Sequence, residues 1–204
     1  MLELNELQSD ALGEIFNIGV GRAAASLSQI VNDEVLLSAP SVQLVRPENA
    51  TSLLEGAELS KLSSVSQDFF GPFEAKATLV FPEFNALEIV RLMVGPHMSV
   101  EELSEFEQEA MCEIGNIILN ACMSALADLF HVSFESTLPL HQYGDTRSIG
   151  ALASTDEAVI LVLQVDMTIS QQRIRGHILF LLSVPSMHRL FELVERYLVE
   201  QGLA

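Results

Sequence analysis

The chain has 204 residues, of which 49% are hydrophobic, and its mean hydropathy of +0.34 is positive, so it can bury a substantial core and is not disordered. The 28 acidic and 10 basic residues give a net charge of −18, which disfavours nucleic acids and anionic membranes as partners and leaves other proteins. We recognise neither an apolar run approaching the ~20 residues of a membrane span nor a signal-peptide pattern. We therefore expect a cytoplasmic protein.

The first half begins with an amphipathic pattern that predicts one long helix over residues 4–31. Gly19 falls on the apolar face of this helix, where a glycine permits close packing. Pro40 marks the next segment as an edge strand or a bulged strand. The expected elements, in chain order, are a helix over 4–31, a strand over 34–45, a short helix over 48–55, strands over 62–70 and 74–81 that form a hairpin, and a helix over 85–94.

The second half repeats this order of elements. Its long helix is expected to open at Ser104, because Glu107 follows at the spacing of a capping box. The expected elements are a helix over 104–130, a strand over 132–141 that contains Pro139, strands over 157–168 and 172–184, and a helix over 187–199. Residues 5–95 and 104–200 thus predict a duplicated unit with pseudo-two-fold symmetry. We expect residues 1–204 to form one α+β domain, with both long helices side by side on a continuous, mainly antiparallel sheet.

A spaced motif recurs at the start of both halves. The first copy is Asp10-x3-Glu14-x2-Asn17-x22-Pro40, and the second copy begins 99 residues later, at position 109 instead of 10. Its residues are Glu109, Glu113, Asn116 and Pro139. If the motif carries a site, the chain therefore carries two.

The helical period places the acidic and amide residues of each copy on one face. Asp10, Glu14 and Asn17 fall within roughly 60° of one another around a helix, and the second helix repeats this with Glu109, Glu113, Asn116 and Asn120. Leu12, Phe16, Gly19, Ala23 and Ile30 lie opposite the first stripe, and Met111, Ile118, Cys122 and Leu129 lie opposite the second. A polar face is common to amphipathic helices. Asparagine, however, is unfavourable inside a helix, and its repetition at the same spacing favours a functional reason.

The residue types limit the chemistry. An asparagine amide can hold a water molecule by donating and accepting hydrogen bonds, and a glutamate can pair with a cation. Neither is an activated nucleophile, no metal-binding pattern is present, and Cys112 and Cys122 are about 15 Å apart on one helix, too far for a disulfide. We interpret both cysteines as core residues. Positioning a water molecule suits phosphoryl transfer, whose catalysis is mostly orientation and charge compensation.

The motif resembles the signature of the CheC/CheX/FliY family of chemotaxis phosphatases, [Asp/Ser]-x3-Glu-x2-Asn-x22-Pro. The first copy matches at all four positions, whereas Glu109 of the second replaces the usual Asp or Ser. The length and the two copies are those of CheC-type members of the family.

The resemblance implies a phosphatase that dephosphorylates the phosphoaspartate of the response regulator CheY. Asn17 and Asn116 would orient the attacking water, and Glu14 and Glu113 would pair with the regulator's lysine. Asp10 and Glu109 would contact the partner surface, Pro40 and Pro139 would shape the strand behind each helix, and Mg²⁺ would come from the regulator, so that the chain needs no cofactor or metal of its own.

The resemblance also implies that the receptor-modifying deamidase CheD is a partner. The alternative function is therefore an adaptor that binds CheD or a phosphorylated regulator without significant turnover. Because two fused half-units supply both motifs within one chain, we expect the isolated protein to be a monomer.

Overall fold

The computed structural model describes residues 3–47, 49, 61–94, 99–145, 158–169 and 171–203. The short helix predicted over 48–55 lies almost entirely outside this part of the chain. The elements, in order, are α1 (Glu6–Val31), β1 (Val35–Val45), β2 (Leu62–Phe70), β3 (Ala75–Pro82), α3 (Glu83–Val94), α4 (Val100–Phe130), β4 (Glu135–Ser136), β5 (Leu140–Gly144), β6 (Ala158–Ile169), β7 (Gln172–Ser183) and α6 (Val184–Glu200).

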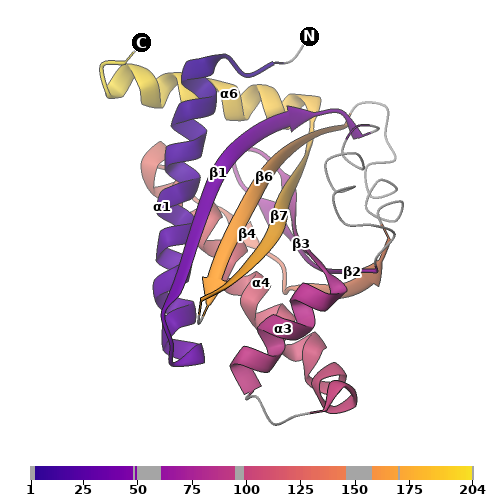
Figure 1. Cartoon of the computed structure of the whole chain (residues 1–204). Coiled ribbons are helices and arrows are strands. Elements are labelled where there is room, and N and C mark those ends of the chain that lie inside the picture. The colour runs from indigo at the N-terminus through magenta and orange to yellow at the C-terminus, as the bar shows by residue number, and fades with distance from the viewer. Residues whose placement is uncertain are drawn as a thin grey trace.

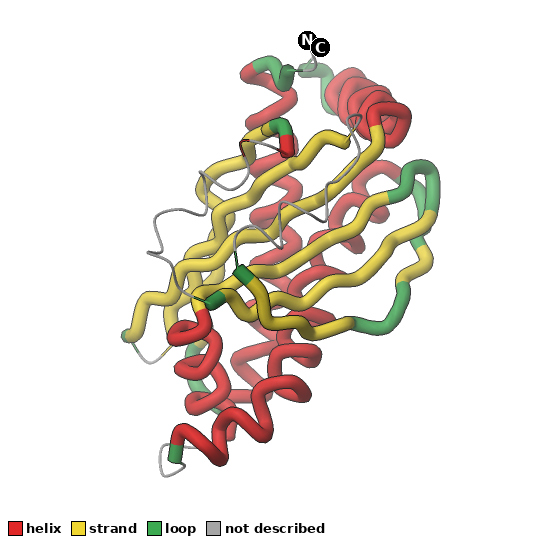
Figure 2. The backbone as a smooth tube through the Cα atoms, turned by 90° about the vertical axis from the view of Figure 1, so that its right-hand side faces the viewer, coloured by secondary structure: helices red, strands yellow, loops and turns green. Residues whose placement is uncertain are grey.

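Seven antiparallel strands form one sheet in the order β1-β6-β7-β3-β2-β4, with β5 also paired to β2. Helices α1 and α4 lie side by side against one face of this sheet (Figures 1 and 2). The predicted α+β arrangement is therefore confirmed. The strand segment that follows the long helix of each half pairs with the hairpin of the other half: β1 pairs with β6, and β4 and β5 pair with β2. The two halves thus build the sheet together.

Successive side chains along each strand point to opposite faces of the sheet. On β3, Leu79 and Phe81 join the main hydrophobic core with the helices, whereas Val80 belongs to a second, smaller cluster with Ile160 and Leu179. The main core contains most of the buried residues of α1 and α4. The helices are thus anchored on the face that carries the larger core.

A bulge in β1 confirms the interpretation of Pro40. The pairing with β6 shifts register between Ser38 and Ser41. Val35 belongs to the main core before the bulge, Ala39 belongs to it within the bulge, and Val42 belongs to it after the bulge. The odd-numbered residues therefore face the helices first and the even-numbered residues afterwards, which is the effect of one extra residue in a strand.

The second half departs from its predicted boundaries in three places. The predicted strand over 132–141 is two short strands, β4 and β5, with Pro139 between them, because proline cannot donate to the ladder. Helix α4 begins at Val100, and its capping box joins Ser99 to Glu102, so the capping box predicted at Ser104 is wrong. Helix α6 begins at Val184 with Pro185 in its first turn, a position where the missing N–H costs nothing.

Close packing of α1 on α4 depends on Gly19. A Cβ atom placed there would lie 2.8 Å from Cα of Cys122 and 3.0 Å from the carbonyl oxygen of Ala121. The prediction that this glycine permits close packing is therefore confirmed. An ion pair of 2.6 Å between Arg22 and Asp128 also joins the two helices.

The predicted apolar sides of the helices are confirmed except at their ends. Ile30 is 41% exposed, contrary to prediction, and Leu129 is only partly buried. Both cysteines are free thiols, and Cys122 is fully buried as predicted. Cys112 is only half-buried, so its interpretation as a core residue was wrong.

Helix α4 contains a segment, Glu102–Phe130, that is long and apolar enough to cross a membrane by composition alone. Of its most apolar 18-residue window, 56% is buried inside the fold. Packing against the sheet and α1 accounts for this apolar character.

Glu107, which was predicted to cap α4, is instead buried beside β5. Its Oε2 accepts a hydrogen bond of 2.9 Å from the Tyr143 hydroxyl, and its Oε1 lies 3.9 Å from Nε2 of His141. The same Nε2 lies 2.8 Å from Oγ of Ser63, which is fully buried. Because Ser63 and Glu107 approach the same ring nitrogen, this cluster cannot act as a catalytic triad, which uses both nitrogens of the histidine. It fastens the edge strand β5 to α4.

Two glycines on α1 provide a matched test of the helix packing. We expect Gly19→Ala to destabilise the protein by about 1–3 kcal/mol, because the methyl group would overlap the backbone of α4. Gly21→Ala meets no atom within 4 Å and should stabilise the protein by up to ~1 kcal/mol through helix propensity. Chemical denaturation of both variants measures the difference. Equal effects of the two substitutions would contradict the close packing.

The buried cluster predicts a dependence of stability on pH. Burial lowers the pKa of His141 below its usual value, although the Glu107 carboxylate opposes the shift. The unfolded chain then binds the proton more readily, so the free energy of unfolding should fall as the pH drops below about 6.5. The pKa of His177 is also lowered by burial, so His177 contributes a pH dependence of the same sign that remains in the His141 variant. We expect His141→Gln to reduce the slope of unfolding free energy between about pH 7.5 and 5.5. An unchanged slope would contradict this role.

Candidate functional site: two acid-amide stripes on the paired helices

The carboxylates of both motifs lie on the surface, as their helical spacing predicted. Asp10 and Glu14 on α1, and Glu109 and Glu113 on α4, are exposed. Among the described residues, none donates a hydrogen bond to these four side chains or forms an ion pair with them. The two stripes therefore present unpaired negative charge to solvent or to a partner.

Asn17 is fixed by the bulge of β1. Its Oδ1 accepts a hydrogen bond of 2.9 Å from the backbone N–H of Ala39, which lies inside the register shift. Because the donor is a backbone amide, the orientation of the Asn17 side chain follows without ambiguity: oxygen faces the strand. The Nδ2 group has no partner in the described part of the chain. The spacing Asn-x22-Pro thus joins a helix residue to the bulge that contains the proline.

Asn116 is fixed by side chains instead of the backbone. Its Oδ1 accepts hydrogen bonds from Nδ2 of Asn120 at 2.8 Å and from Nε2 of Gln67 at 3.3 Å. Asn116 and Asn120 are both half-buried, whereas Asn17 is exposed. The two sites have the same residues but different supports.

The segment around Pro139 lies behind the second site. The Pro139 carbonyl is 3.8 Å from Sγ of Cys112, and the Thr137 carbonyl accepts a hydrogen bond of 2.9 Å from Gln67. Gln67 therefore links the proline-bearing segment to Asn116. Sequence reasoning missed Gln67, because a glutamine within a strand gives no local signal of a contact 49 residues away.

The described residues contain no cluster of three or more histidine, cysteine, aspartate or glutamate side chains that could hold a metal ion. The available chemistry is that of oriented amides beside unpaired carboxylates. Such a surface can hold a water molecule and attract a cationic group, but it contains no activated nucleophile.

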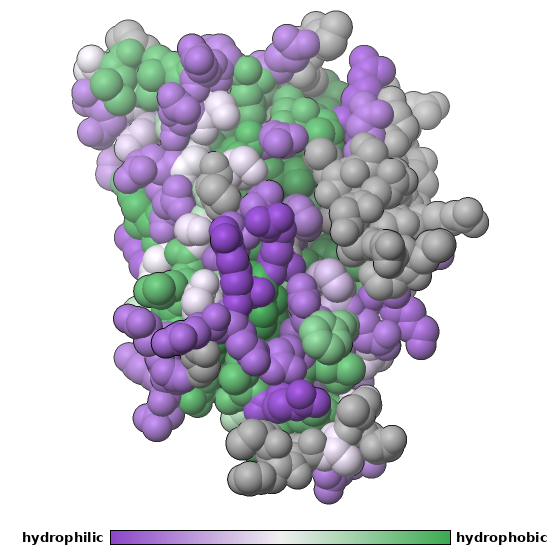
Figure 3. All heavy atoms as spheres, viewed as in Figure 1, coloured by the Kyte–Doolittle hydropathy of each residue, from purple (hydrophilic) through white to green (hydrophobic). Residues whose placement is uncertain are grey.

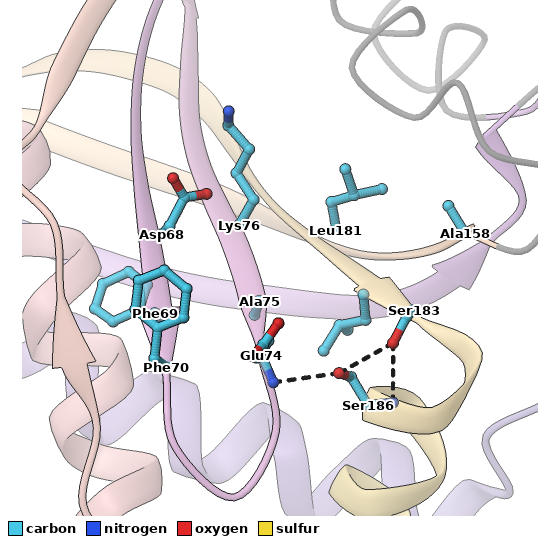
Figure 4. Close-up of a pocket in the computed structure, with 11 residues that line it drawn as sticks. Asp68, Phe69, Phe70, Glu74, Ala75, Lys76, Ala158, Leu181, Ser183 and Ser186 are labelled. Atoms are coloured by element: carbon cyan, nitrogen blue, oxygen red, sulfur yellow. Dashed lines mark hydrogen bonds between the residues drawn. The ribbon is translucent and has the colours of Figure 1, made fainter.

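An open hollow of about 260 Å³ lies away from the motifs, between the β2–β3 hairpin, β7 and the start of α6. Figure 4 shows Asp68 and Lys76 beside it and the hydroxyl groups of Ser183 and Ser186 at its base. Ser186 Oγ accepts from the backbone N–H of Glu74 at 3.2 Å, and Ser183 caps α6. The two serine hydroxyl groups are satisfied by structural contacts, and no motif residue lines the hollow.

The sheet face that points away from α1 and α4 carries another polar group. Figure 3 shows hydrophilic side chains near the middle of the molecule in the view of β1, β6 and β7. On these strands Asp166 forms ion pairs of 2.8 Å with Arg173 and 3.0 Å with Arg175. Two guanidinium groups face one carboxylate, so this cluster is net positive, opposite in sign to the motif stripes.

Comparison with known proteins finds similarity to CheC-like proteins. The model of the CheC-like family matches residues 7–44, a range that contains the complete first motif. The chain is 25% identical over 197 residues to the protein named CheY-P phosphatase CheC of Bacillus subtilis, covering 92% of this chain and 94% of that protein. It is 23% identical to the flagellar motor switch phosphatase FliY of the same organism over 83% of this chain, which spans 44% of FliY.

The fold agrees with this similarity. The crystal structure of Thermotoga maritima FliY superimposes with a TM-score of 0.77 and 21% identity, covering 96% of this chain and all of that one. At this level of identity the likeness shows a common fold. Together with the family model that matches residues 7–44 and the relative that aligns along nearly the whole chain, it shows that this chain is similar to CheC-like proteins.

Proposed function

We propose that the chain is a hydrolase that removes the phosphoryl group from the phosphoaspartate of a CheY-type response regulator. The observation that carries the proposal is the pair of asparagines whose amide oxygens are held by the fold, each three residues after an unpaired glutamate. The names of the relatives, CheY-P phosphatase and flagellar motor switch phosphatase, support the same reaction.

In this proposal each asparagine positions the attacking water. The hydrogen bond from Ala39 fixes the plane of the Asn17 amide, and its Nδ2 donors and second oxygen lone pair are available for a water molecule. A water held in line with the phosphorus needs little further ordering in the transition state, which is the main source of catalysis in phosphoryl transfer. Asn116, whose Oδ1 already accepts two hydrogen bonds, would hold the water through its Nδ2 donors at the second site.

The glutamates supply charge rather than chemistry. Glu14 and Glu113 lie one helical turn before the asparagines and have no cationic partner among the described residues. We assign each of them to an ion pair with the lysine beside the regulator's phosphoryl group, because an ammonium and a carboxylate form a strong, charge-assisted hydrogen bond. Asp10 and Glu109, one turn further away, would contact the rim of the regulator. Mg²⁺ belongs to the regulator in this scheme.

An adaptor that binds a regulator without turnover would gain nothing from a fixed amide. The hydrogen bonds that hold Asn17 and Asn116 therefore favour catalysis over the adaptor function. CheD as a partner, the monomeric state and the cytoplasmic location stay predictions of the sequence.

Alanine substitutions of the asparagines test the catalytic assignment. We expect Asn17→Ala and Asn116→Ala each to remove part of the phosphate release from a phosphorylated CheY-type regulator, and the double variant to remove nearly all of it, a loss of about 100-fold or more. Asn85→Ala on α3, whose side chain bonds only a backbone carbonyl, is the matched control. Circular dichroism checks folding, since the first variant leaves the Ala39 N–H without its acceptor. A folded, fully active double variant would refute the assignment.

Neutral isosteres of the glutamates separate binding from turnover. We expect Glu14→Gln together with Glu113→Gln to weaken the affinity for a beryllofluoride-activated regulator by about tenfold, the effect of losing a charge-assisted contact. Glu34→Gln together with Glu74→Gln, two exposed carboxylates outside the stripes, controls for the change in net charge. Isothermal titration gives the affinities. The assignment of the glutamates to an ion pair is wrong if the double variant and the control bind the regulator with equal affinity and dephosphorylate it at equal rates.

A further inference from the structure

Gln67 is a buried amide in the middle of β2. It is 2% exposed, and both of its Nε2 hydrogens find acceptors: Oδ1 of Asn116 at 3.3 Å and the carbonyl of Thr137 at 2.9 Å. Its Oε1 accepts from Nδ2 of Asn120 at 3.3 Å. A buried primary amide that is satisfied on both sides has a single favourable orientation, because any rotation would leave a polar atom unpaired.

Asn120 closes the network from the helix side. Its Nδ2 lies 2.8 Å from both the backbone oxygen and Oδ1 of Asn116, one turn earlier on α4. The three amides of Gln67, Asn116 and Asn120 therefore form a closed triangle of hydrogen bonds. One corner of the triangle is the asparagine of the second motif.

The first site has no counterpart of this triangle in the described residues. There the backbone N–H of Ala39 holds Asn17, and a backbone donor within a strand cannot be removed by changing a side chain. The second site uses the Gln67 side chain for the same purpose. The two sites therefore differ in which substitution can release the asparagine.

We propose that Gln67 is a positioning residue for Asn116 and thereby controls turnover at the second site alone. This inference rests on the proposed function, in which Asn116 orients water. Gln67 is buried beneath the helix and touches no substrate. It acts by holding Oδ1 toward the sheet, so that the Nδ2 edge of the amide stays on the outer side of α4.

The test isolates each site by disabling the other. In the Asn17→Ala background, where the second site alone remains, we expect Gln67→Met to lower kcat by about tenfold or more with KM unchanged, because misplacing a catalytic group by about 1 Å costs up to ~100-fold. In the Asn116→Ala background, the same substitution reports on damage to the fold, and first-site kcat should change by less than about twofold. Methionine preserves the buried volume, and thermal melting measures its effect on stability.

A second variant and an NMR measurement test the role of Gln67 without relying on the phosphate-release assay alone. Gln67→Glu retains the acceptor for Asn120 but loses both donors, so it should impair the second site as methionine does. NMR relaxation of the side-chain amides requires no substrate: the order parameter of Asn116 Nδ2 should fall in Gln67→Met, and that of Asn17 should not. If the wild type released no phosphate while Asn116 still became mobile, the proposed function would fail and the positioning would stand. Unchanged order parameters, or equal loss of kcat at both sites, would overturn the role of Gln67.

Discussion

The exchange of first strands between the two halves is the constraint on which the rest of the structure depends. Strand β1 completes the hairpin of the second half, and β5 completes the hairpin of the first. Neither half can therefore satisfy its strand edges or cover its hydrophobic face alone. The exchange brings α1 and α4 together on one face, where Gly19 lets their backbones approach closely. The acid-amide stripes consequently sit on one rigid two-helix layer, and each site is supported by strands from both repeats.

The duplicated spacing has a physical meaning that differs between the copies. In the first copy the bulge leaves the backbone N–H of Ala39 free of the strand ladder, and Asn17 Oδ1 accepts a hydrogen bond from it. In the second copy Pro139 breaks the strand, and the side chain of Gln67 replaces the missing backbone donor. The same motif residues are thus supported in two different ways, and in both the asparagine of a surface helix is held in one orientation.

Much of this could be predicted because the signals are local. The periodicity of α1, the hairpin of residues 62–81 and the strand-bending effect of Pro40 each depend on residues close together in the sequence. The predicted start of α4 was wrong because Ser99-Glu102 and Ser104-Glu107 fit the same capping pattern. Only the burial of Glu107 beside β5 distinguishes the two pairs. The role of Gln67 was not predictable, since its partners lie 49 and 70 residues away.

The central claim is that Asn17 and Asn116 enter the active site of the regulator, beside its metal. Paramagnetic relaxation tests this directly: Mn²⁺ replaces Mg²⁺ in a beryllofluoride-activated CheY-type regulator, and the side-chain amide signals of this protein are followed during titration. The account predicts that the Nδ2 signals of Asn17 and Asn116 broaden first, before those of Asn85 on α3. Broadening confined to other surfaces, such as the sheet face around Asp166, would contradict it.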